Sequence, residues 1–324
     1  MNFKGRAGRI LSGSQAKAVH ITAILMSIFH LYFLGIGVID PWLYRGGHLA
    51  FGLVIIFLIT PATKKSVKDK FTMTDIILAA LSVMVYIYLI INLKGLNMRA
   101  GVSPTTSDII VAAVAIILVI EASRRYFGPM LPSIAIIFML YAYFGRYIPG
   151  DFMVPAYSIK RIVSYLFSTT GMYGTTIATS ATYVFLFVLF GVFLVETGVG
   201  DVYMDIAKSI TGGVRGGPAK IAVVSSAFFG SVSGSASSNV VTTGTFTIPL
   251  MKKTGYKGTF AAAVETTASI GGLFLPPIMG AGGFLMADIL QIPYWQVAKA
   301  AALPAILYYI ALFILVDFEA VSLN

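Results

Sequence analysis

Residues 231–249 read SVSGSASSNVVTTGTFTIP, a run of small polar residues between two apolar runs. Gly234 and Gly244 weaken a helix, and serine and threonine side chains compete for its backbone hydrogen bonds. A bilayer core holds no water that could satisfy free backbone groups, so such a break is expected there only when it is buried in protein or lines a cavity. Breaks of this kind mark ion and substrate sites in secondary transporters. The stretch is therefore the first candidate site.

The composition around this stretch is that of a membrane protein. Hydrophobic residues make up 57% and charged residues 11% of the chain, and the mean hydropathy is +0.87. The absence of cysteine excludes disulfides and thiolate metal sites. The net charge of +10 does not indicate nucleic-acid binding, because the basic residues form short clusters between apolar runs. We therefore expect an all-α integral membrane protein that folds as a multi-span helical bundle. The lipid bilayer is then one of its partners.

Seven apolar runs are predicted to cross the membrane. They are residues 19–39, 48–59, 76–93, 109–120, 130–148, 182–195 and 294–316. The second and fourth runs are shorter than the ~20 residues that a spanning helix needs, so hydropathy does not fix their ends. Residues 156–170 carry Lys160 and Arg161 among apolar residues, a pattern that predicts a helix lying in the membrane interface.

The basic clusters predict the orientation of these spans. Arg6, Arg9 and Lys17 precede the first run, residues 64–70 contain four lysines, and Arg124 and Arg125 follow the fourth run. Because cytoplasmic loops carry the excess of lysine and arginine, the N-terminus is predicted to be cytoplasmic.

The same rule predicts that residues 231–249 do not cross the membrane. Arg215 and Lys220 precede the stretch, and Lys252, Lys253 and Lys257 follow it. If both ends are cytoplasmic, the segment must enter, turn near residues 235–239 and return. The charges thus predict a re-entrant helical hairpin with a polar tip.

A second break follows the hairpin. Gly271, Gly272, Pro276 and Pro277 interrupt a helical pattern, and each proline removes a donor and disfavours helix before it. The freed carbonyls near 272–275, with serine, threonine and asparagine oxygens, are hard ligands that suit Na⁺. The N-terminus of a following half-helix, near Ile278, could hold an anionic group. The fold class thus includes a Gly/Pro-broken helix beside the re-entrant hairpin.

Two sets of candidate site residues follow from these breaks. The predicted Na⁺ ligands are Ser233, Ser235, Asn239, Gly272, Leu275 and Pro277. The predicted hairpin and substrate residues are Ser238, Thr242, Thr243 and Ile278.

Each candidate also has a purely structural interpretation. Small hydroxyl residues permit close helix packing, and the two prolines could be a simple kink. Asn239 is harder to explain in this way, because an amide at membrane depth needs hydrogen-bond partners. Glu265 is a carboxylate at membrane depth, which by default indicates a functional site. For Glu265 we nevertheless favour hydrogen bonding between helices.

The sequence does not predict an enzyme. GSVSG around Val232 has valine where a G-x-S-x-G nucleophile elbow has serine. His-Glu-x-x-His and paired aspartate motifs are also absent from the sequence.

Several long motifs carry a family resemblance. These are GSASSNVVTTGTFTIPLMKKTGY, FAAAVETTASIGG, LPPIMGAGGFLMAD, PAILYY, RGGPAKIAVVSSAFFGSVSGSA and RGGHLAFGLVIIFLITP. They resemble the integral-membrane permease of tripartite ATP-independent periplasmic (TRAP) transporters, and most closely the fused permease of the TAXI-associated group. The resemblance implies a small four-helix part at residues 1–128, a linking helix at 129–156 and the first inverted half of the large part at 157–324.

The resemblance also implies a function. Such permeases lie in the bacterial inner membrane, receive small organic anions from a periplasmic substrate-binding protein, and are driven by a Na⁺ gradient in an elevator-like mechanism. The sequence shows no second hairpin of the SGS type and no second GG…PP break, so we expect only the first inverted half, with the missing second half as a further partner. The alternative is a truncated, non-transporting scaffold that only docks partners.

Overall fold

The computed structural model describes residues 3–4, 9–36, 40–63, 66–100 and 102–322. Arg6, Lys64 and Lys65, which contributed to the predicted orientation, lie outside the described residues. By its internal contacts the chain forms two compact units, Met1–Ala181 and Thr182–Asn324. This division by packing does not test the predicted division at residues 128 and 156, which stays a prediction.

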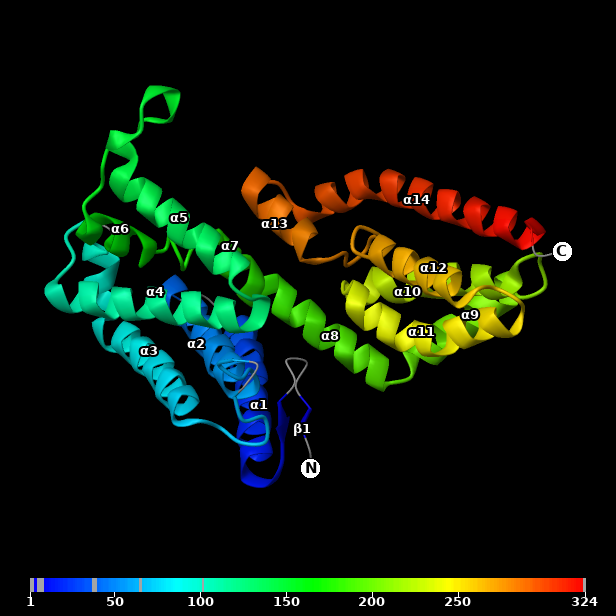
Figure 1. Ribbon diagram of the computed structural model, residues 1–324, viewed down its shortest axis with the longest axis horizontal. Coiled ribbons are helices and arrows are strands. Elements are labelled where there is room, and N and C mark those ends of the chain that lie inside the picture. Colours follow the sequence, from blue (N-terminus) through cyan, green and yellow to red (C-terminus); the bar gives the residue numbers. More distant parts are fainter. Residues whose placement is uncertain (1–2, 5–8, 37–39, 64–65, 101, 323–324) are drawn as a thin grey trace. The chain divides into compact units, whose positions relative to one another are not determined.

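The first unit is built from helices and one short strand pair (Figure 1). Strands β1 (Phe3–Lys4) and β2 (Ile10–Leu11) pair antiparallel. The helices are α1 (Gly13–Ile36), α2 (Pro41–Ile59), α3 (Met73–Arg99), α4 (Thr106–Phe127), α5 (Met130–Phe144), α6 (Ile159–Leu166) and α7 (Thr175–Thr179). The 3-10 turns η1 (Gly145–Tyr147) and η2 (Gly150–Phe152) follow α5. The π-helical turn η3 (Ser180–Val184) follows α7, and its last three residues belong to the second unit.

The second unit consists of helices joined by turns, with no strand among the residues described. Its helices are α8 (Phe185–Glu196), α9 (Val199–Thr211), α10 (Gly217–Ser233), α11 (Ala236–Lys253), α12 (Gly258–Gly271), α13 (Ala281–Leu290) and α14 (Tyr294–Ser322). Helices α10, α11 and α12 pack on one another, and α14 packs along α10 and α12 (Figure 1).

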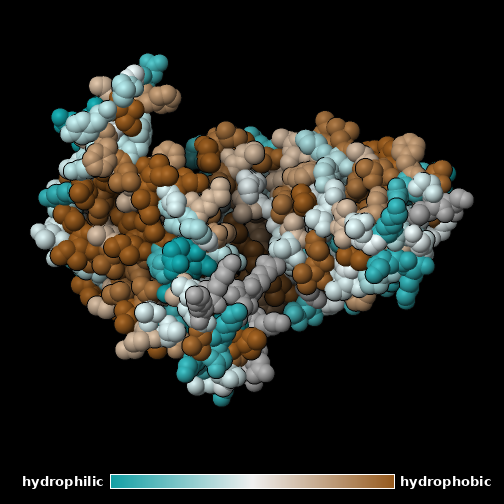
Figure 2. All heavy atoms as spheres, in the orientation of Figure 1, coloured by the Kyte–Doolittle hydropathy of each residue, from teal (hydrophilic) through white to brown (hydrophobic). Residues whose placement is uncertain are grey.

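Seven helical segments among the described residues are long and apolar enough to cross a membrane. They are Gly13–Gly35, Pro41–Ile59, Met73–Arg99, Thr106–Phe127, Met130–Tyr147, Thr175–Leu194 and Tyr294–Ser322. Each contains most or all of one predicted run, so the predicted multi-span all-α membrane fold is confirmed. Figure 2 shows large apolar side chains over much of the visible face, as expected of surfaces that contact lipid.

The two runs whose ends hydropathy did not fix belong to longer helices, each for a local chemical reason. Helix α2 begins at Pro41 because the Asp40 carboxylate caps it by accepting a hydrogen bond from the backbone N–H of Trp42 at 2.8 Å. Proline is also well suited to the first turn of a helix. Helix α4 continues to Phe127 because Glu121 pairs with Arg124 at 2.7 Å and with Arg125 at 2.8 Å along the helix. Charged residues therefore extended this helix instead of ending it.

The predicted interfacial helix is shorter than expected. Residues 156–170 contain α6, which covers only Ile159–Leu166. Ser158 caps α6 by accepting from the backbone N–H of Arg161 at 3.2 Å. Val163 is buried while Lys160 and Arg161 are exposed, so the basic residues of α6 point away from its buried side. Its place in the membrane interface stays a prediction.

A buried charge network ties the ends of four segments together in the first unit. Asp75, near the start of α3, accepts from Arg9 at 2.9 Å and from Arg125 at 2.6 Å, and all three side chains are at most 1% exposed. Arg9 also donates to the carbonyl of Leu58 at 3.2 Å. The carboxylate thereby compensates two buried guanidinium groups, a role that no apolar residue could fill.

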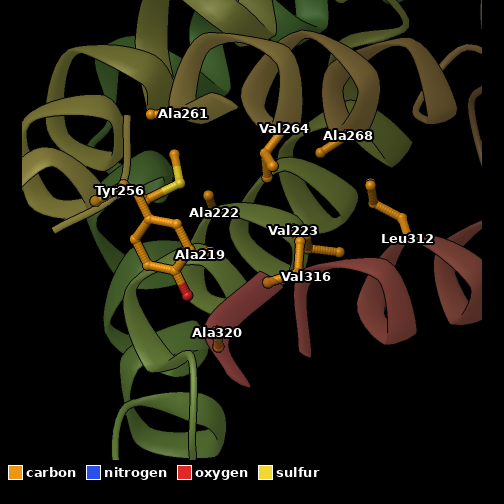
Figure 3. Packing of buried hydrophobic residues seen from close by; sticks show 11 residues of the cluster. Ala219, Ala222, Val223, Tyr256, Ala261, Val264, Ala268, Leu312, Val316 and Ala320 are labelled. Carbon is orange, nitrogen blue, oxygen red and sulfur yellow. The ribbon is translucent and has the colours of Figure 1, made fainter. Parts of the chain in front are cut away.

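The core of the second unit is built from small side chains. Figure 3 shows Ala219, Ala222 and Val223 of α10 facing residues of α12 and α14. The buried members on those helices are Ala261, Val264, Ala268, Leu312, Val316 and Ala320. Small residues let helix backbones approach closely where lipid offers no hydrophobic driving force. This packing holds α10 and α12 in a fixed relation, which positions the candidate site.

Candidate functional site

The predicted hairpin is formed by α10 and α11, which pack antiparallel around Gly234. The Ser226 and Thr243 hydroxyls lie 3.1 Å apart across the pair. Gly234 has a φ of +58°, a left-handed conformation that favours glycine, and the Ser235 hydroxyl caps α11 by accepting from the Ser238 N–H at 3.3 Å. The hairpin turns at Gly234 and Ser235, so the predicted turn at residues 235–239 is correct only at its first residue, and Asn239 already lies within α11.

Glycine is required at two points where the hairpin meets the second break. A Cβ on Gly234 would lie 2.3 Å from the Met279 carbonyl oxygen. A Cβ on Gly230 would lie 2.6 Å from the Cα of Gly272. Any side chain at these positions would push the two segments apart.

The break itself covers the residues between α12 and α13. The Ile278 N–H donates to the Ser231 carbonyl at 3.0 Å, and the Gly280 N–H donates to the Leu273 carbonyl at 2.6 Å. The following half-helix therefore begins at Ala281 and not near Ile278, because Ile278 is used by the hairpin and Met279 has a φ of +57°. The hairpin and the break thus form one joined element.

The carbonyls predicted as ion ligands differ in availability. Those of Gly272 and Leu275 accept no hydrogen bond from any residue that the structure describes, since proline at 276 has no N–H to offer Gly272. The Pro277 carbonyl instead accepts from the Tyr294 hydroxyl at 2.9 Å. Two of the three predicted carbonyls are therefore available to a cation.

The other predicted polar residues are not brought together at one point. Ser233 and Ser235 flank Gly234 at the hairpin tip and are half-buried, as is Ser238. Thr242 is half-buried on the side of α11 toward α9, where a Cβ added to Gly200 would lie 3.8 Å from its Cγ2. Asn239 and Thr243 point into the interior of the hairpin.

The interior of α10, α11 and α12 holds a second polar group, the Glu265 cluster. It consists of Glu265 and the hydroxyl residues Ser226, Thr243, Thr247 and Ser269, all buried. Glu265 accepts from Ser226 at 3.0 Å, from Thr247 at 2.5 Å, from Ser269 at 3.4 Å and from Thr243. The hydrogen bonds between helices that we expected of Glu265 are present.

Asn239 extends this cluster toward the tip. Its Nδ2 donates to the Ser226 carbonyl at 2.8 Å, and its Oδ1 accepts from Thr243 at 3.1 Å. Both ends of the buried amide are thus satisfied, as an amide at membrane depth requires. Asn239 therefore joins α11 to α10 directly below the tip.

The sequence interpretation missed Ser226, Thr247 and Ser269. The signal was present in the spacing: Asn239, Thr243 and Thr247 recur every four residues, and Glu265 and Ser269 do the same. Residues four apart share one face of a helix, so this periodicity predicts two polar stripes that meet between helices.

This geometry defines a class of protein: a multi-span helical membrane protein in which a hairpin packs against a broken helix. Residues 114–324 match the family "Tripartite ATP-independent periplasmic transporter, DctM component". The match covers more than half of the chain, which therefore belongs to this family.

Curated relatives agree with this assignment. The chain is 29% identical over 168 residues to the C4-dicarboxylate TRAP transporter large permease protein DctM of Pseudomonas aeruginosa, covering 46% of this chain and 38% of that protein. It is 35% identical over 91 residues to the protein of the same name from Rhodobacter capsulatus, covering 28% and 21%. It is 33% identical over 91 residues to the isethionate TRAP transporter permease protein DctMQ of Oleidesulfovibrio alaskensis, covering 28% and 14%.

Each alignment covers only part of the relative's length. The chain spans at most 38% of the length of these three relatives. No solved structure matches the chain significantly.

Proposed function

We propose that this chain is a permease component of a Na⁺-driven secondary transporter that takes up small organic anions. The observation that carries the proposal is the junction between hairpin and break, where the Ile278 N–H donates to the Ser231 carbonyl at 3.0 Å. Irregular backbone at membrane depth is stable only where it is buried or lines a cavity, and transporters place ion and substrate sites at such points.

The available carbonyls support Na⁺ as the coupling ion. The carbonyls of Gly272 and Leu275 accept no hydrogen bond from a described residue, and Ser233 and Ser235 at the hairpin tip carry further hydroxyl oxygens. Such hard oxygen donors suit Na⁺. Asn239 shapes the site from below by fixing α11 to α10.

The names of the relatives support an anionic substrate. One is named for C4-dicarboxylates and another for isethionate, both small organic anions. The nearest helix N-terminus is that of α13 at Ala281, whose free N–H groups suit an anion. Thr242 and Ser238, half-buried on α11, are the proposed polar contacts of the substrate.

The proposal includes partners and a place in the cell. A periplasmic substrate-binding protein delivers the anion, and the permease lies in the inner membrane with its N-terminus in the cytoplasm. The chain is of the fused, TAXI-associated type, with residues 1–128 as the small part, 129–156 as the linking helix and 157–324 as the first half of the large part.

The test is uptake into proteoliposomes that hold the purified chain, with its binding protein outside. Labelled C4-dicarboxylate and isethionate are supplied under an inward Na⁺ gradient and, in parallel, under a choline gradient. The proposal predicts uptake that needs both Na⁺ and the binding protein. Binding-protein docking without uptake would instead favour the non-transporting scaffold.

A further inference from the structure

The Glu265 cluster holds a buried carboxyl group that forms no ion pair with any residue that the structure describes. Glu265 is 0% exposed, and no lysine, arginine or histidine among the described residues forms an ion pair with it. Burying an isolated carboxylate is costly unless it is paired or neutralised. Elsewhere in the chain the structure obeys this rule, since buried Asp75 is paired with two arginines.

Four hydroxyl groups from three helices surround the carboxylate. They belong to Ser226 of α10, Thr243 and Thr247 of α11, and Ser269 of α12, and the amide oxygen of Asn239 lies behind Thr243. All of these donor atoms are oxygen, and oxygen ligands with no sulfur or nitrogen suit hard cations.

Each threonine hydroxyl has a second acceptor in its own helix, to which its single proton can turn in place of Glu265. Thr243 lies 2.9 Å from the carbonyl of Asn239, and Thr247 lies 3.1 Å from the carbonyl of Thr243. Each hydroxyl proton therefore has a backbone acceptor within its own helix. Once the proton turns there, the hydroxyl lone pairs face the Glu265 carboxylate.

We propose that Glu265 and its surrounding hydroxyls bind one Na⁺ ion, at a site separate from the carbonyls of the break. One monovalent cation balances one carboxylate, whereas a divalent ion would leave an uncompensated positive charge in the interior. This site joins α10, α11 and α12 through their side chains, while the junction at Gly272 uses backbone carbonyls. Na⁺ bound at Glu265 thus stabilises the packing of the hairpin on α12.

The experiment measures Na⁺ binding by the full purified chain and does not need transport. Equilibrium dialysis with radiolabelled Na⁺ gives the number of ions per chain, and thermal melting is followed while NaCl replaces choline chloride at constant ionic strength. The variants are Glu265→Gln, which keeps the shape and removes the charge, and Glu196→Gln, whose glutamate is exposed at the end of α8.

The expected result is that E265Q binds one Na⁺ fewer than the wild type and that its melting temperature rises less with NaCl. E196Q should match the wild type in both measurements. Equal Na⁺ binding by E265Q and the wild type overturns the proposal. If their melting temperatures also converge on acidification, a proton neutralises the carboxylate in place of Na⁺.

A second variant covers the case in which E265Q does not fold. Thr247→Val keeps the charge and the branched shape but removes the hydroxyl that lies 2.5 Å from the carboxylate. T247V should need a several-fold higher Na⁺ concentration to fill the site, and an unchanged half-saturation point overturns the proposal. Because these assays measure binding, failure of this site and failure of Na⁺-driven uptake give different results.

Discussion

Gly230 of α10 and Gly272 at the end of α12 meet backbone to backbone. A Cβ added to Gly272 would lie 2.5 Å from the Cα of Gly230, closer than any side chain allows. The contact sets how near the hairpin tip comes to the break. The hairpin and the break can lie this close only because neither Gly230 nor Gly272 has a side chain.

Gly230→Val should therefore separate the hairpin from the break. We expect a loss of about 1–3 kcal/mol of stability, as for overpacking in a close-packed core, together with loss of Na⁺-dependent uptake. Melting in detergent and uptake in proteoliposomes measure the two effects. Gly35→Val is the matched control, because Gly35 is exposed on α1 and nothing lies within 4 Å of a Cβ at that position. Normal uptake by G230V would show that the close contact is not needed.

Tyr294→Phe should loosen the break while keeping its aromatic packing. The Tyr294 hydroxyl donates to the Pro277 carbonyl at 2.9 Å, and the ring stacks on Phe284 at 4.2 Å between centroids. Loss of the hydroxyl should lower stability by about 1 kcal/mol and reduce uptake. Tyr203→Phe is the control, since that ring stacks on Phe228 and its hydroxyl makes no hydrogen bond with the described residues. Equal behaviour of the two variants would contradict the assigned role of Tyr294.

Asp75→Asn should strongly destabilise the first unit. Asp75 faces Arg9 and Arg125, whose side chains are 0% and 1% exposed. Removing the negative charge leaves both guanidinium groups without full compensation, which typically costs about 3–5 kcal/mol. Thermal melting of D75N against D69N checks this, because Asp69 is exposed and forms no ion pair with a described residue. A D75N melting temperature close to that of D69N would mean that the network contributes little.

The re-entrant path of the hairpin can be tested with single cysteines, because the chain contains none. Gly213→Cys before α10 and Lys253→Cys at the end of α11 are both exposed. A membrane-impermeant thiol reagent should reach both from the cytoplasmic side only, since the flanking basic residues favour that side. Asp151→Cys should react from the opposite side. Labelling of residues 213 and 253 from opposite sides would make the segment a crossing and rule out a hairpin that returns.

Hydropathy and charge were sufficient to predict the spans, because lipid imposes a long apolar run on every crossing helix. Span ends were less predictable. Helix α2 starts at Pro41, capped by Asp40, before the predicted run at residues 48–59, and the charged residues after Ile120 stayed helical through ion pairs along α4. Such local pairing is invisible to an average over a window of residues.

The candidate site was predicted in part. The prolines and glycines located the break, but its exit at Ala281 depends on the bond between Ile278 and Ser231, a contact between segments that the sequence does not reveal. Asn239 was predicted because a buried amide demands partners. Ser226 was missed because a single serine in an apolar helix carries no signal until its partner Glu265 is placed beside it.

The central claim is that Na⁺ and a small organic anion cross the membrane together through the joined hairpin and break. The most direct test follows radiolabelled Na⁺ and labelled anion at the same time in proteoliposomes of the wild type and Asn239→Ala. Asn239 fixes the hairpin through its bond to the Ser226 carbonyl. The account predicts a constant ratio of Na⁺ to anion in the wild type and a joint fall of both fluxes in N239A. Anion uptake at the wild-type rate with no accompanying Na⁺ would contradict it.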